Sequence, residues 1–347
     1  MKRLLLGFIL LLGITAGAQT TLSFDYGGLT REYILYTPSG ASSGVDLPLV
    51  YNFHGYTNNM TFQMNYCGMN SIAEANNFFV VYPQGTPDSF GINHWNAWQD
   101  PTDVDDIGFI SALTDYLIAN YNVNPQRVYS CGFSNGGIFS YALAAQLSTK
   151  IAAVASVAGT MSEAMITLAN PQRQVPVFHI HGTSDPVVPF DGSPGQYPNF
   201  GTLTSVATTL AYWNEYDACT TDATSGISNT SLIDLCTAQK TIYSNCGEHD
   251  NWYIEIASGG HTWPGTTPLV VTGNTCQDFN GSQEIWNFFS QIEMPVGIAE
   301  MATATNVSIR AIYRMDGSKT EATSLRLLHG YYVVQYSDFT TKKVFIP

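Results

Sequence analysis

The residues around position 134 form a pattern that can make a serine act as a nucleophile. A β-prone run, residues 128–131, leads into Gly132-Phe133-Ser134-Asn135-Gly136, and a helical run follows from Ile138 to Leu147. In this strand–turn–helix setting, Gly-x-Ser-x-Gly predicts a strained elbow, because its glycines let the strand and the helix approach closely. We expect the hydroxyl of Ser134 to stand clear of the sheet and attack a carbonyl carbon. The alternative interpretation is a plain glycine-rich turn.

A nucleophilic serine needs a base, and the base needs a carboxylate that orients it. Asp185 lies shortly after the apolar run Val175–Ile180, and His261 lies on a glycine-hinged loop after the run Trp252–Ile256. Both runs are typical of strands, so both side chains would lie at the carboxyl ends of strands, where open α/β sheets place their sites. The chain order Ser, Asp, His is that of α/β-hydrolases. The sequence therefore predicts a triad of Ser134, Asp185 and His261.

A loop after an early strand can supply the donors that bind an oxyanion. The apolar run Leu47–Phe53 ends in His54-Gly55-Tyr56. We predict that the backbone N–H groups of Tyr56 and Asn135 form the oxyanion hole, with Gly55 as a neighbour. His54 is expected to brace this loop.

Three tryptophans lie near the predicted site. Trp95 and Trp98 fall within the irregular stretch 87–104, and Trp263 lies two residues after His261. They could form an aromatic wall that binds a ring of the substrate, or they could pack beneath loops. For Trp263 the packing interpretation is favoured.

Two further patterns resemble functional ones but have structural interpretations. His179-x-His181 has the same-face spacing of a metal-binding pair, yet no third ligand is evident, so we expect hydrogen-bonded core histidines. Asp105 and Asp106 are interpreted as the start of a helix, where a carboxylate is favoured by the dipole. We predict neither a metal nor a cofactor.

Strand-like and helix-like runs alternate over residues 19–294, which predicts one α/β domain with a mostly parallel sheet flanked by helices. A polar loop is expected up to Met69, and a polar insertion over Asp217–Thr241. The remaining predicted strands are a hairpin over Ser23–Tyr36 that turns at Gly27-Gly28, then Leu47–Phe53, Phe78–Tyr82 and Ile151–Val157. The predicted helices are Asn70–Asn76, Val104–Tyr121, Ile138–Leu147, Thr202–Tyr216 and Ser282–Ile292.

The first 18 residues have the features of a signal peptide. Lys2-Arg3 precedes the apolar run Leu4–Ile14, and Ala16-Gly17-Ala18 fits a cleavage site, so the mature chain is expected to begin at Gln19. Export to an oxidising compartment agrees with six cysteines, an even number that suggests disulfides. The preferred pair is Cys219–Cys246, because these residues flank the polar insertion.

Composition limits the partners. The chain of 347 residues has a net charge of −14, and residues 19–297 hold five basic and 23 acidic residues. An acidic domain of this kind argues against nucleic acid or an anionic membrane as a partner. Beyond the N-terminus, no stretch of the sequence is long and apolar enough to predict a membrane span.

The chain changes character after Pro295. Residues 295–308 resemble a linker, and residues 309–347 contain short alternating runs with turn residues, among them Gly330–Tyr336 and Lys342–Ile346. This pattern predicts a small all-β unit at the C-terminus.

Taken together, several motifs resemble the polyhydroxybutyrate-depolymerase/feruloyl-esterase group within carbohydrate esterase family 1. They are Asp105-Asp106-Ile107-Gly108-Phe109, the Gly-Phe-Ser-Asn-Gly-Gly elbow, His181-Gly182-Thr183-Ser184-Asp185-Pro186 and Gly259-Gly260-His261-Thr262-Trp263-Pro264-Gly265. The resemblance covers roughly residues 22–292. It implies an α/β-hydrolase fold and a metal-free serine esterase acting on feruloyl, acetyl-xylan or short hydroxyalkanoate esters, with the same three triad residues.

The C-terminal unit resembles a type A sorting domain of the type IX (Por) secretion system, which implies passage across an outer membrane to the medium or the cell surface. The features are Ile312–Gly317, Gly330–Val334 and Lys342-Lys343-Val344. Three alternatives stay open for the main domain. It could be a polyhydroxybutyrate depolymerase proper, a serine peptidase or acyltransferase on the same fold, or a non-catalytic surface binding protein.

Overall fold

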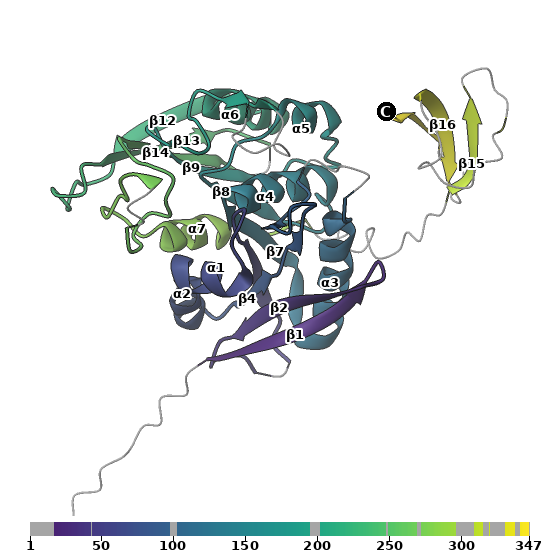
Figure 1. The fold of residues 1–347 in the computed structure, drawn as a ribbon, viewed down its shortest axis with the longest axis horizontal. Helices are drawn as coiled ribbons and strands as arrows, with labels where there is room; N and C mark the ends of the chain where they lie inside the picture. The colour runs from purple at the N-terminus through teal and green to yellow at the C-terminus, as the bar shows by residue number, and fades with distance from the viewer. Residues whose placement is uncertain are drawn as a thin grey trace, which may run out of the picture.

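A ten-stranded sheet organises the main domain (Figure 1). The structure is a computed structural model, and it describes residues 17–42, 44–97, 103–194, 202–247, 249–268, 272–295, 309–314, 319, 330–336 and 341–346. The strand order is β1-β2-β4-β3-β7-β8-β9-β14-β13-β12. The strands from β4 to β14 in this order run parallel, and an antiparallel pair closes each edge. The predicted fold class is thereby confirmed.

The parallel strands follow the apolar runs of the sequence. They are β3 (Leu47–Phe53), β4 (Phe79–Pro83), β7 (Val123–Phe133), β8 (Ala153–Val157), β9 (Val177–Gly182) and β14 (Asn251–Ala257). All residues of β3, β4, β8 and β9 are buried, as expected of parallel strands that are covered on both faces, and so are seven of eleven in β7 and four of seven in β14. The edge strands are β1 (Ala18–Tyr26), β2 (Leu29–Thr37), β13 (Thr237–Ser244) and β12 (Thr221–Gly226).

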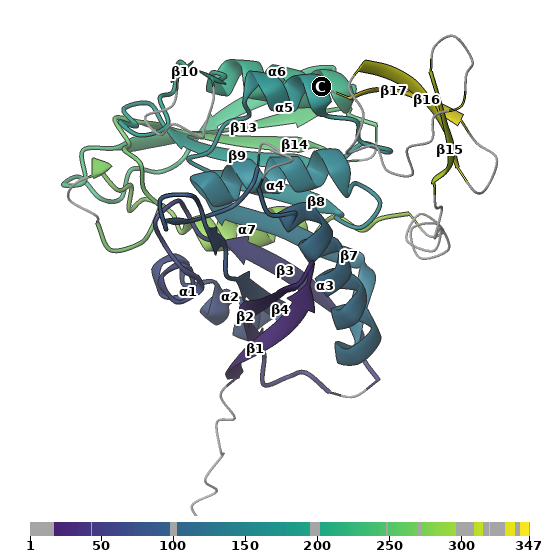
Figure 2. The ribbon, with the colours of Figure 1, turned by 45° about the vertical axis from the view of Figure 1, so that its right-hand side comes forward.

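Helices cover both faces of the sheet and enclose two apolar cores (Figure 2). Along β3, Leu49 and Tyr51 contribute to one core and Val50 to the other, as the alternation of a strand requires. The first core contains residues of α3 (Asp106–Tyr121), α4 (Asn135–Gln146), α5 (Glu163–Leu168) and α6 (Val206–Tyr216). The second contains residues of α1 (Met60–Cys67), α2 (Met69–Asn76) and α7 (Gly281–Phe289).

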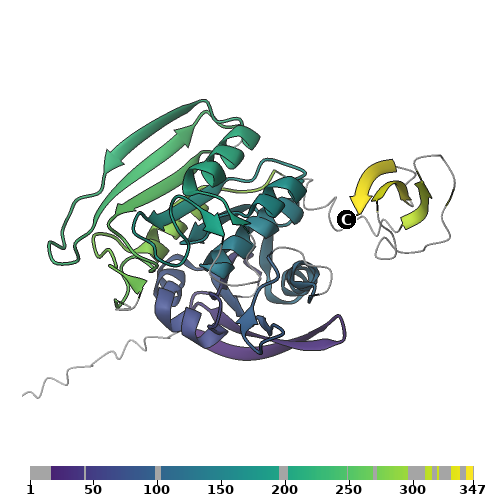
Figure 3. The same cartoon turned by 45° about the horizontal axis from the view of Figure 1, so that its top comes forward.

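The structure corrects two expectations about polar segments. The loop predicted up to Met69 contains helix α1, which begins where the side chain of Asn59 accepts a hydrogen bond from the N–H of Phe62. The insertion predicted over Asp217–Thr241 contains β12 and the first part of β13, which extend the sheet beyond β14 (green in Figure 3). Every residue of β12 is exposed, so no apolar alternation marked it as a strand.

The N-terminal hairpin forms as predicted and is anchored to the middle of the domain. It turns at Gly27 and Gly28, whose φ angles are 60° and 82°. Arg31 on β2 reaches Asp106 at the start of α3, with a distance of 2.7 Å between Nη2 and Oδ1, and both side chains are buried. The other carboxylate oxygen of Asp106 accepts a hydrogen bond from the N–H of Asn96.

Short strands complete the described chain. Two small antiparallel pairs lie in loops, β5 (Thr86–Pro87) with β6 (Asn93–His94), and β10 (Ser193–Pro194) with β11 (Thr202–Leu203). Near the C-terminus, β15 (Ile309–Arg314), β16 (Gly330–Tyr336) and β17 (Thr341–Ile346) form a separate three-stranded antiparallel sheet. Residues 1–16 of the predicted signal peptide, and residues 296–308 of the predicted linker, lie outside the described residues.

Within the part of the chain that the structure describes, no helix has both the length and the apolar composition needed to cross a bilayer.

Candidate active site

Ser134 lies on a strained turn between β7 and α4. Its φ and ψ are 55° and −120°, a conformation that non-glycine residues rarely adopt. The turn is held by a hydrogen bond from the N–H of Ser134 to the carbonyl of Val157, 2.8 Å long. A Cβ added at Gly136 would lie 2.3 Å from the carbonyl oxygen of Phe53, so only glycine fits there. The elbow predicted from the sequence is present.

Asp185 and His261 come together at the same rim of the sheet. The Nδ1 of His261 donates to Oδ2 of Asp185 at 2.7 Å, because a carboxylate oxygen accepts. The ring of His261 lies 4.7 Å from that of Phe133, the residue before Ser134. The exposed fractions of Ser134, Asp185 and His261 are 7%, 6% and 5%. The structure thus brings the acid and the base to the elbow, with Nε2 of His261 as the ring nitrogen that Asp185 does not use.

The loop after β9 prepares Asp185 for this contact. Its other oxygen, Oδ1, accepts hydrogen bonds from the N–H groups of Val187 and Val188, at 2.8 and 2.9 Å. Burial pushes the pKa of Asp185 upward, but His261, His181 and the donated hydrogen bonds outweigh it, so the pKa lies below its usual value. Asp185 is therefore a carboxylate at neutral pH and can stabilise a cationic imidazole.

The predicted oxyanion loop lies directly beside the serine. A Cβ added at Gly55 would be 3.3 Å from the Cβ of Ser134. The hydroxyl of Tyr56 donates to Asp88 at 2.8 Å, which ties the loop to the segment after β5. Asn135 is the first residue of α4, where backbone N–H groups have no partner within the helix. The positions of both predicted donors agree with an oxyanion hole, and their catalytic role stays a prediction.

His54 braces this loop in a single protonation state. Its Nδ1 donates to the carbonyl of Gly55 at 2.8 Å, and its Nε2 accepts from the N–H of Gly85 at 2.9 Å. This pattern requires a neutral ring with the proton on Nδ1. Burial lowers the pKa of His54 to about 4, which keeps the ring neutral at physiological pH.

Two of the three tryptophans are buried and form no aromatic wall, which confirms the packing interpretation favoured for Trp263 and decides the open choice for Trp95. Trp95 and Trp263 are both fully buried, with no exposed surface. The indole N–H of Trp95 donates to the carbonyl of His54 at 3.0 Å, and its backbone forms two hydrogen bonds with the side chain of Asn135. The indole N–H of Trp263 donates to Ser282 at 3.1 Å. Trp95 therefore supports the oxyanion loop from below, Trp263 packs in the core, and Trp98 lies outside the described residues.

A hollow of about 650 Å³ lies beside the site, and no sequence motif predicts it. Tyr66 connects it to the triad: its hydroxyl accepts from the N–H of Trp263 at 3.0 Å, and its ring lies 5.6 Å from that of Phe133. Most of the residues that line the hollow belong to helix α1, where the sequence pattern predicts a loop. The lining residues are Asn59, Met60, Thr61, Phe62, Asn65, Tyr66, Gln84 and Thr267.

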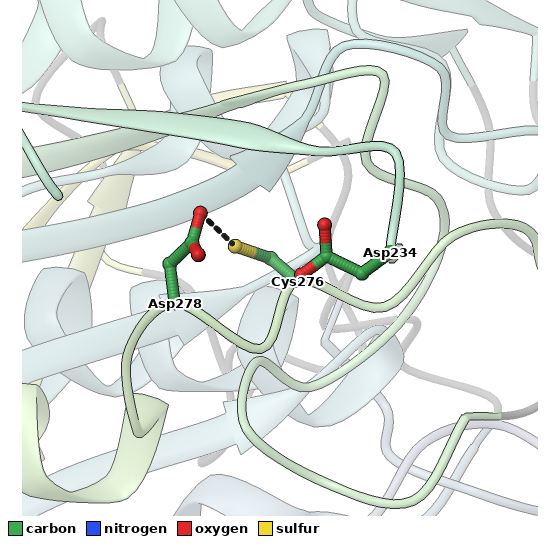
Figure 4. Close-up of side chains that lie close together, drawn as sticks. All are labelled: Asp234, Cys276 and Asp278. Carbon is green, nitrogen blue, oxygen red and sulfur yellow. Dashed lines mark hydrogen bonds between the residues drawn. The ribbon is translucent and has the colours of Figure 1, made fainter. Parts of the chain in front are cut away.

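Two of the six cysteines form a disulfide. Cys219 and Cys246 form the predicted disulfide, and Cys67, Cys131, Cys236 and Cys276 are free. Asp234, Cys276 and Asp278 lie together (Figure 4), within reach of a common metal ion. However, both carboxylates already accept backbone hydrogen bonds: Asp278 from Thr230 and Ser231, and Asp234 from Gln277. They connect the loop between β12 and β13 to the segment that follows His261.

Comparison with known proteins places the chain in a family. The family model described as Phospholipase/Carboxylesterase matches residues 54–203. The protein named "Putative esterase NocK", from Nocardia uniformis subsp. tsuyamanensis, is 30% identical over 283 residues, which cover 73% of this chain and 79% of NocK. The chain belongs to the same family of α/β-hydrolase esterases as NocK.

Other members of these esterase groups agree with this placement. The bifunctional acetylxylan esterase/xylanase XynS20E of Neocallimastix patriciarum is 32% identical over 173 residues, or 50% of this chain and 24% of that protein. Feruloyl esterase B of Piromyces equi is 25% identical over 269 residues, or 76% and 46%. This esterase chain thus spans a quarter to a half of those two relatives. An acetyl xylan esterase from Aspergillus awamori shares its fold, with a TM-score of 0.55, 16% identity, and coverage of 79% and 99%.

Proposed function

We propose that the protein is a serine esterase that hydrolyses carboxylic esters through an acyl-enzyme. The observation that carries this proposal is the hydrogen bond between Asp185 and His261, formed beside the elbow that holds Ser134. Membership of an esterase family and the strained serine elbow support the same chemistry.

The reaction needs one proton carrier and one anion site. The hydroxyl oxygen of Ser134 attacks the ester carbonyl while Nε2 of His261 takes its proton, and Asp185 stabilises the imidazolium. The N–H groups of Tyr56 and Asn135 bind the oxyanion. His261 then gives the proton to the departing alkoxide, which leaves as the alcohol. Water attacks the acyl-enzyme with His261 as base again, and the acid is released as Ser134 regains its proton.

The substrate class is proposed from the relatives and the hollow. Relatives carry the names acetylxylan esterase and feruloyl esterase, so we propose feruloyl or acetyl-xylan esters, with short hydroxyalkanoate esters as a further member of the class. Phe62 and Tyr66, whose rings pack against each other with centres 5.2 Å apart, give the hollow one aromatic side, and its volume of about 650 Å³ accommodates an aromatic acid. A polyhydroxybutyrate depolymerase and a peptidase or acyltransferase share the same acyl-enzyme chemistry.

Two measurements test the proposal. A fluorophosphonate probe is expected to label the protein. Ser134→Ala is expected to abolish this labelling and to lower the rate of ester hydrolysis about 10⁶-fold. Full activity in Ser134→Ala would overturn the assignment, and failure to label would favour the non-catalytic binding protein. Comparing methyl ferulate, p-nitrophenyl acetate, a hydroxybutyrate oligomer and a peptide anilide separates the substrate classes.

We further propose that the protein is exported to the medium or the cell surface. Residues 1–18 would direct it across the inner membrane, and residues 309–347, whose described strands form a small antiparallel sheet, would engage the type IX secretion machinery. Expression in a host that carries this machinery tests the idea. When the full-length sequence is expressed, we expect the protein outside the cell with Gln19 at its N-terminus. When the expressed sequence ends at residue 294, we expect the protein to stay in the periplasm. Equal export of both chains would refute the sorting role.

A further inference from the structure

Three buried side chains form a continuous chain of hydrogen bonds behind Asp185. The hydroxyl of Tyr141 lies 2.7 Å from Nδ1 of His179, and Nε2 of His179 lies 3.1 Å from Nδ1 of His181. Nε2 of His181 in turn lies 2.9 Å from the carbonyl oxygen of Val188. Tyr141 belongs to α4, the helix that begins after Ser134, and both histidines belong to β9. The chain therefore connects the nucleophile helix to the loop of the acid.

The protons in this chain can be placed one by one. The carbonyl of Val188 only accepts, so Nε2 of His181 carries a proton. Burial lowers the pKa of both histidines, so each ring is neutral and has one N–H. Nδ1 of His181 must then accept from Nε2 of His179, and Nδ1 of His179 must accept from Tyr141. Each group has one donor and one acceptor, and the donors all point toward the loop of Asp185.

This arrangement also decides against a metal on the histidine pair. A histidine that binds a metal uses a free ring lone pair. The lone pair of His181 is directed at His179, and the lone pair of His179 is directed at Tyr141. The same-face spacing seen in the sequence therefore serves a hydrogen bond between the two rings.

The chain ends at the atoms that orient the acid. Val188, whose carbonyl accepts from His181, uses its own N–H to hold Oδ1 of Asp185. Nε2 of His181 is also 3.5 Å from Oδ2 of Asp185, the oxygen that binds His261. A donor near Oδ2 and two donors at Oδ1 leave the carboxylate one orientation in which it meets His261.

We infer that His181, itself oriented by His179 and Tyr141, is a positioning residue that fixes the loop of Asp185 so that Oδ2 faces the catalytic base. The inference rests on the proposed function, in which Asp185 and His261 act on Ser134. It assigns His181 a role that depends on where its proton lies, whereas a histidine that only fills space would have no such dependence.

Two substitutions at His181 separate these roles. Glutamine places an amide N–H near the former Nε2 and can still donate to Val188, whereas asparagine reaches only as far as Nδ1. We expect His181→Asn to lower kcat about 10²-fold with KM for p-nitrophenyl acetate little changed, because a carboxylate displaced by about 1 Å orients the base poorly. His181→Gln should recover most of that loss. Equal losses in both variants, or no loss in either, would overturn the inference.

A second pair of variants tests the other end of the hydrogen-bond chain, at Tyr141. This test remains valid even if the His181 variants fail to fold. Tyr141→Phe removes the donor to His179, and the matched control Tyr51→Phe removes a buried hydroxyl that bonds to Thr114 at 2.9 Å. Both should lower Tm similarly, but only Tyr141→Phe should lower kcat, by about three- to tenfold. An equal fall of kcat in both would point to general packing and sink the proposal. Ser134→Ala, assayed beside them, shows separately whether the proposed function itself holds.

Discussion

The two sides of Ser134 are supported by neutral buried histidines with opposite proton positions. On the side of the proposed oxyanion hole, called the oxyanion side below, His54 carries its proton on Nδ1 and holds its own loop between the carbonyl of Gly55 and the N–H of Gly85. On the acid side, His179 and His181 carry their protons on Nε2. Every hydrogen bond in this chain is therefore donated in the same direction, from α4 toward the loop of Asp185. In both places a backbone carbonyl, which can only accept, decides the tautomer.

The two sides differ in what they hold. The oxyanion side positions backbone N–H groups, supported from below by Trp95 and the side chain of Asn135. The acid side positions a side-chain carboxylate through two backbone N–H groups of its loop and through the buried side chains that hold this loop. On the acid side, the loss of activity should therefore depend on whether a substituted side chain keeps its hydrogen bonds. On the oxyanion side, the loss of activity should depend on how well the substituted side chain keeps the loop packed in place.

The largest effect is expected on the acid side. Asp185→Asn should lower kcat about 10⁴-fold, because an amide can donate to Nδ1 of His261 and favours the wrong tautomer of the base. Steady-state kinetics with p-nitrophenyl acetate measures the loss. A loss below tenfold would show that Asp185 is not the orienting acid.

On the oxyanion side, Asn135→Ala keeps the backbone N–H but removes both hydrogen bonds to the backbone of Trp95. We expect kcat to fall about 10²-fold, similar to the loss of one oxyanion donor, because the loop above Trp95 shifts. Asn135→Asp, which can still accept from the N–H of Trp95 but turns a buried carboxylate oxygen toward its carbonyl, should lose at least as much. If both variants kept full activity, Trp95 and Asn135 would have no part in shaping the oxyanion hole.

The hollow next to α1 should affect binding of one class of substrate. Phe62→Ala is expected to raise KM for methyl ferulate about tenfold, the value of a lost aromatic contact, and to leave p-nitrophenyl acetate unchanged. Asn65→Ala, on the same wall, serves as the matched control without loss of a ring. If Phe62→Ala raised KM equally for both esters, the feruloyl group of the substrate would not bind in this hollow.

The smallest effect concerns pH and stability. The pKa of His54 is lowered from 6.5 to about 4, so between these values the unfolded chain binds a proton that the folded protein excludes. The free energy of unfolding should therefore fall as the pH drops from 6.5 toward 4, by about 1 kcal/mol per pH unit from this group, with His179 and His181 acting in the same direction. Urea unfolding across this range measures the slope. His54→Asn should show a shallower slope than the parent, and an unchanged slope would contradict the assignment.

Much of the site could be predicted because strong local patterns carry it. The glycines at positions 132 and 136 mark the elbow, and Asp185 and His261 follow apolar runs that form buried parallel strands. Parallel strands formed by such runs have their carboxyl ends at the same rim of the sheet, whatever the sequences of the connecting loops. The fold class and the meeting of Asp185 with His261 followed from this.

The errors arose where the deciding partner is distant in the sequence or the pattern is weak. Nothing near Trp95 indicates that Asn135, forty residues later, clamps its backbone and turns its ring into the core. Helix α1 is polar enough that its few buried residues gave no clear helical period. For His179 and His181, the lack of a third ligand favoured hydrogen-bonded core histidines, but the bond between their rings and its direction required the positions of Tyr141 and Val188.

The contact of Arg31 with Asp106 gives the first forty residues an influence beyond the edge of the sheet. If Arg31 alone were replaced, the buried carboxylate of Asp106 would lose the guanidinium beside it, at a cost of about 3–5 kcal/mol. The same carboxylate holds Asn96, the neighbour of Trp95. A truncated protein that starts after residue 37 would lose two strands together with the cation that holds Asp106, and so would weaken the support of Asn96 beside the proposed oxyanion loop. Shortening this end to improve expression is therefore expected to reduce activity as well as stability.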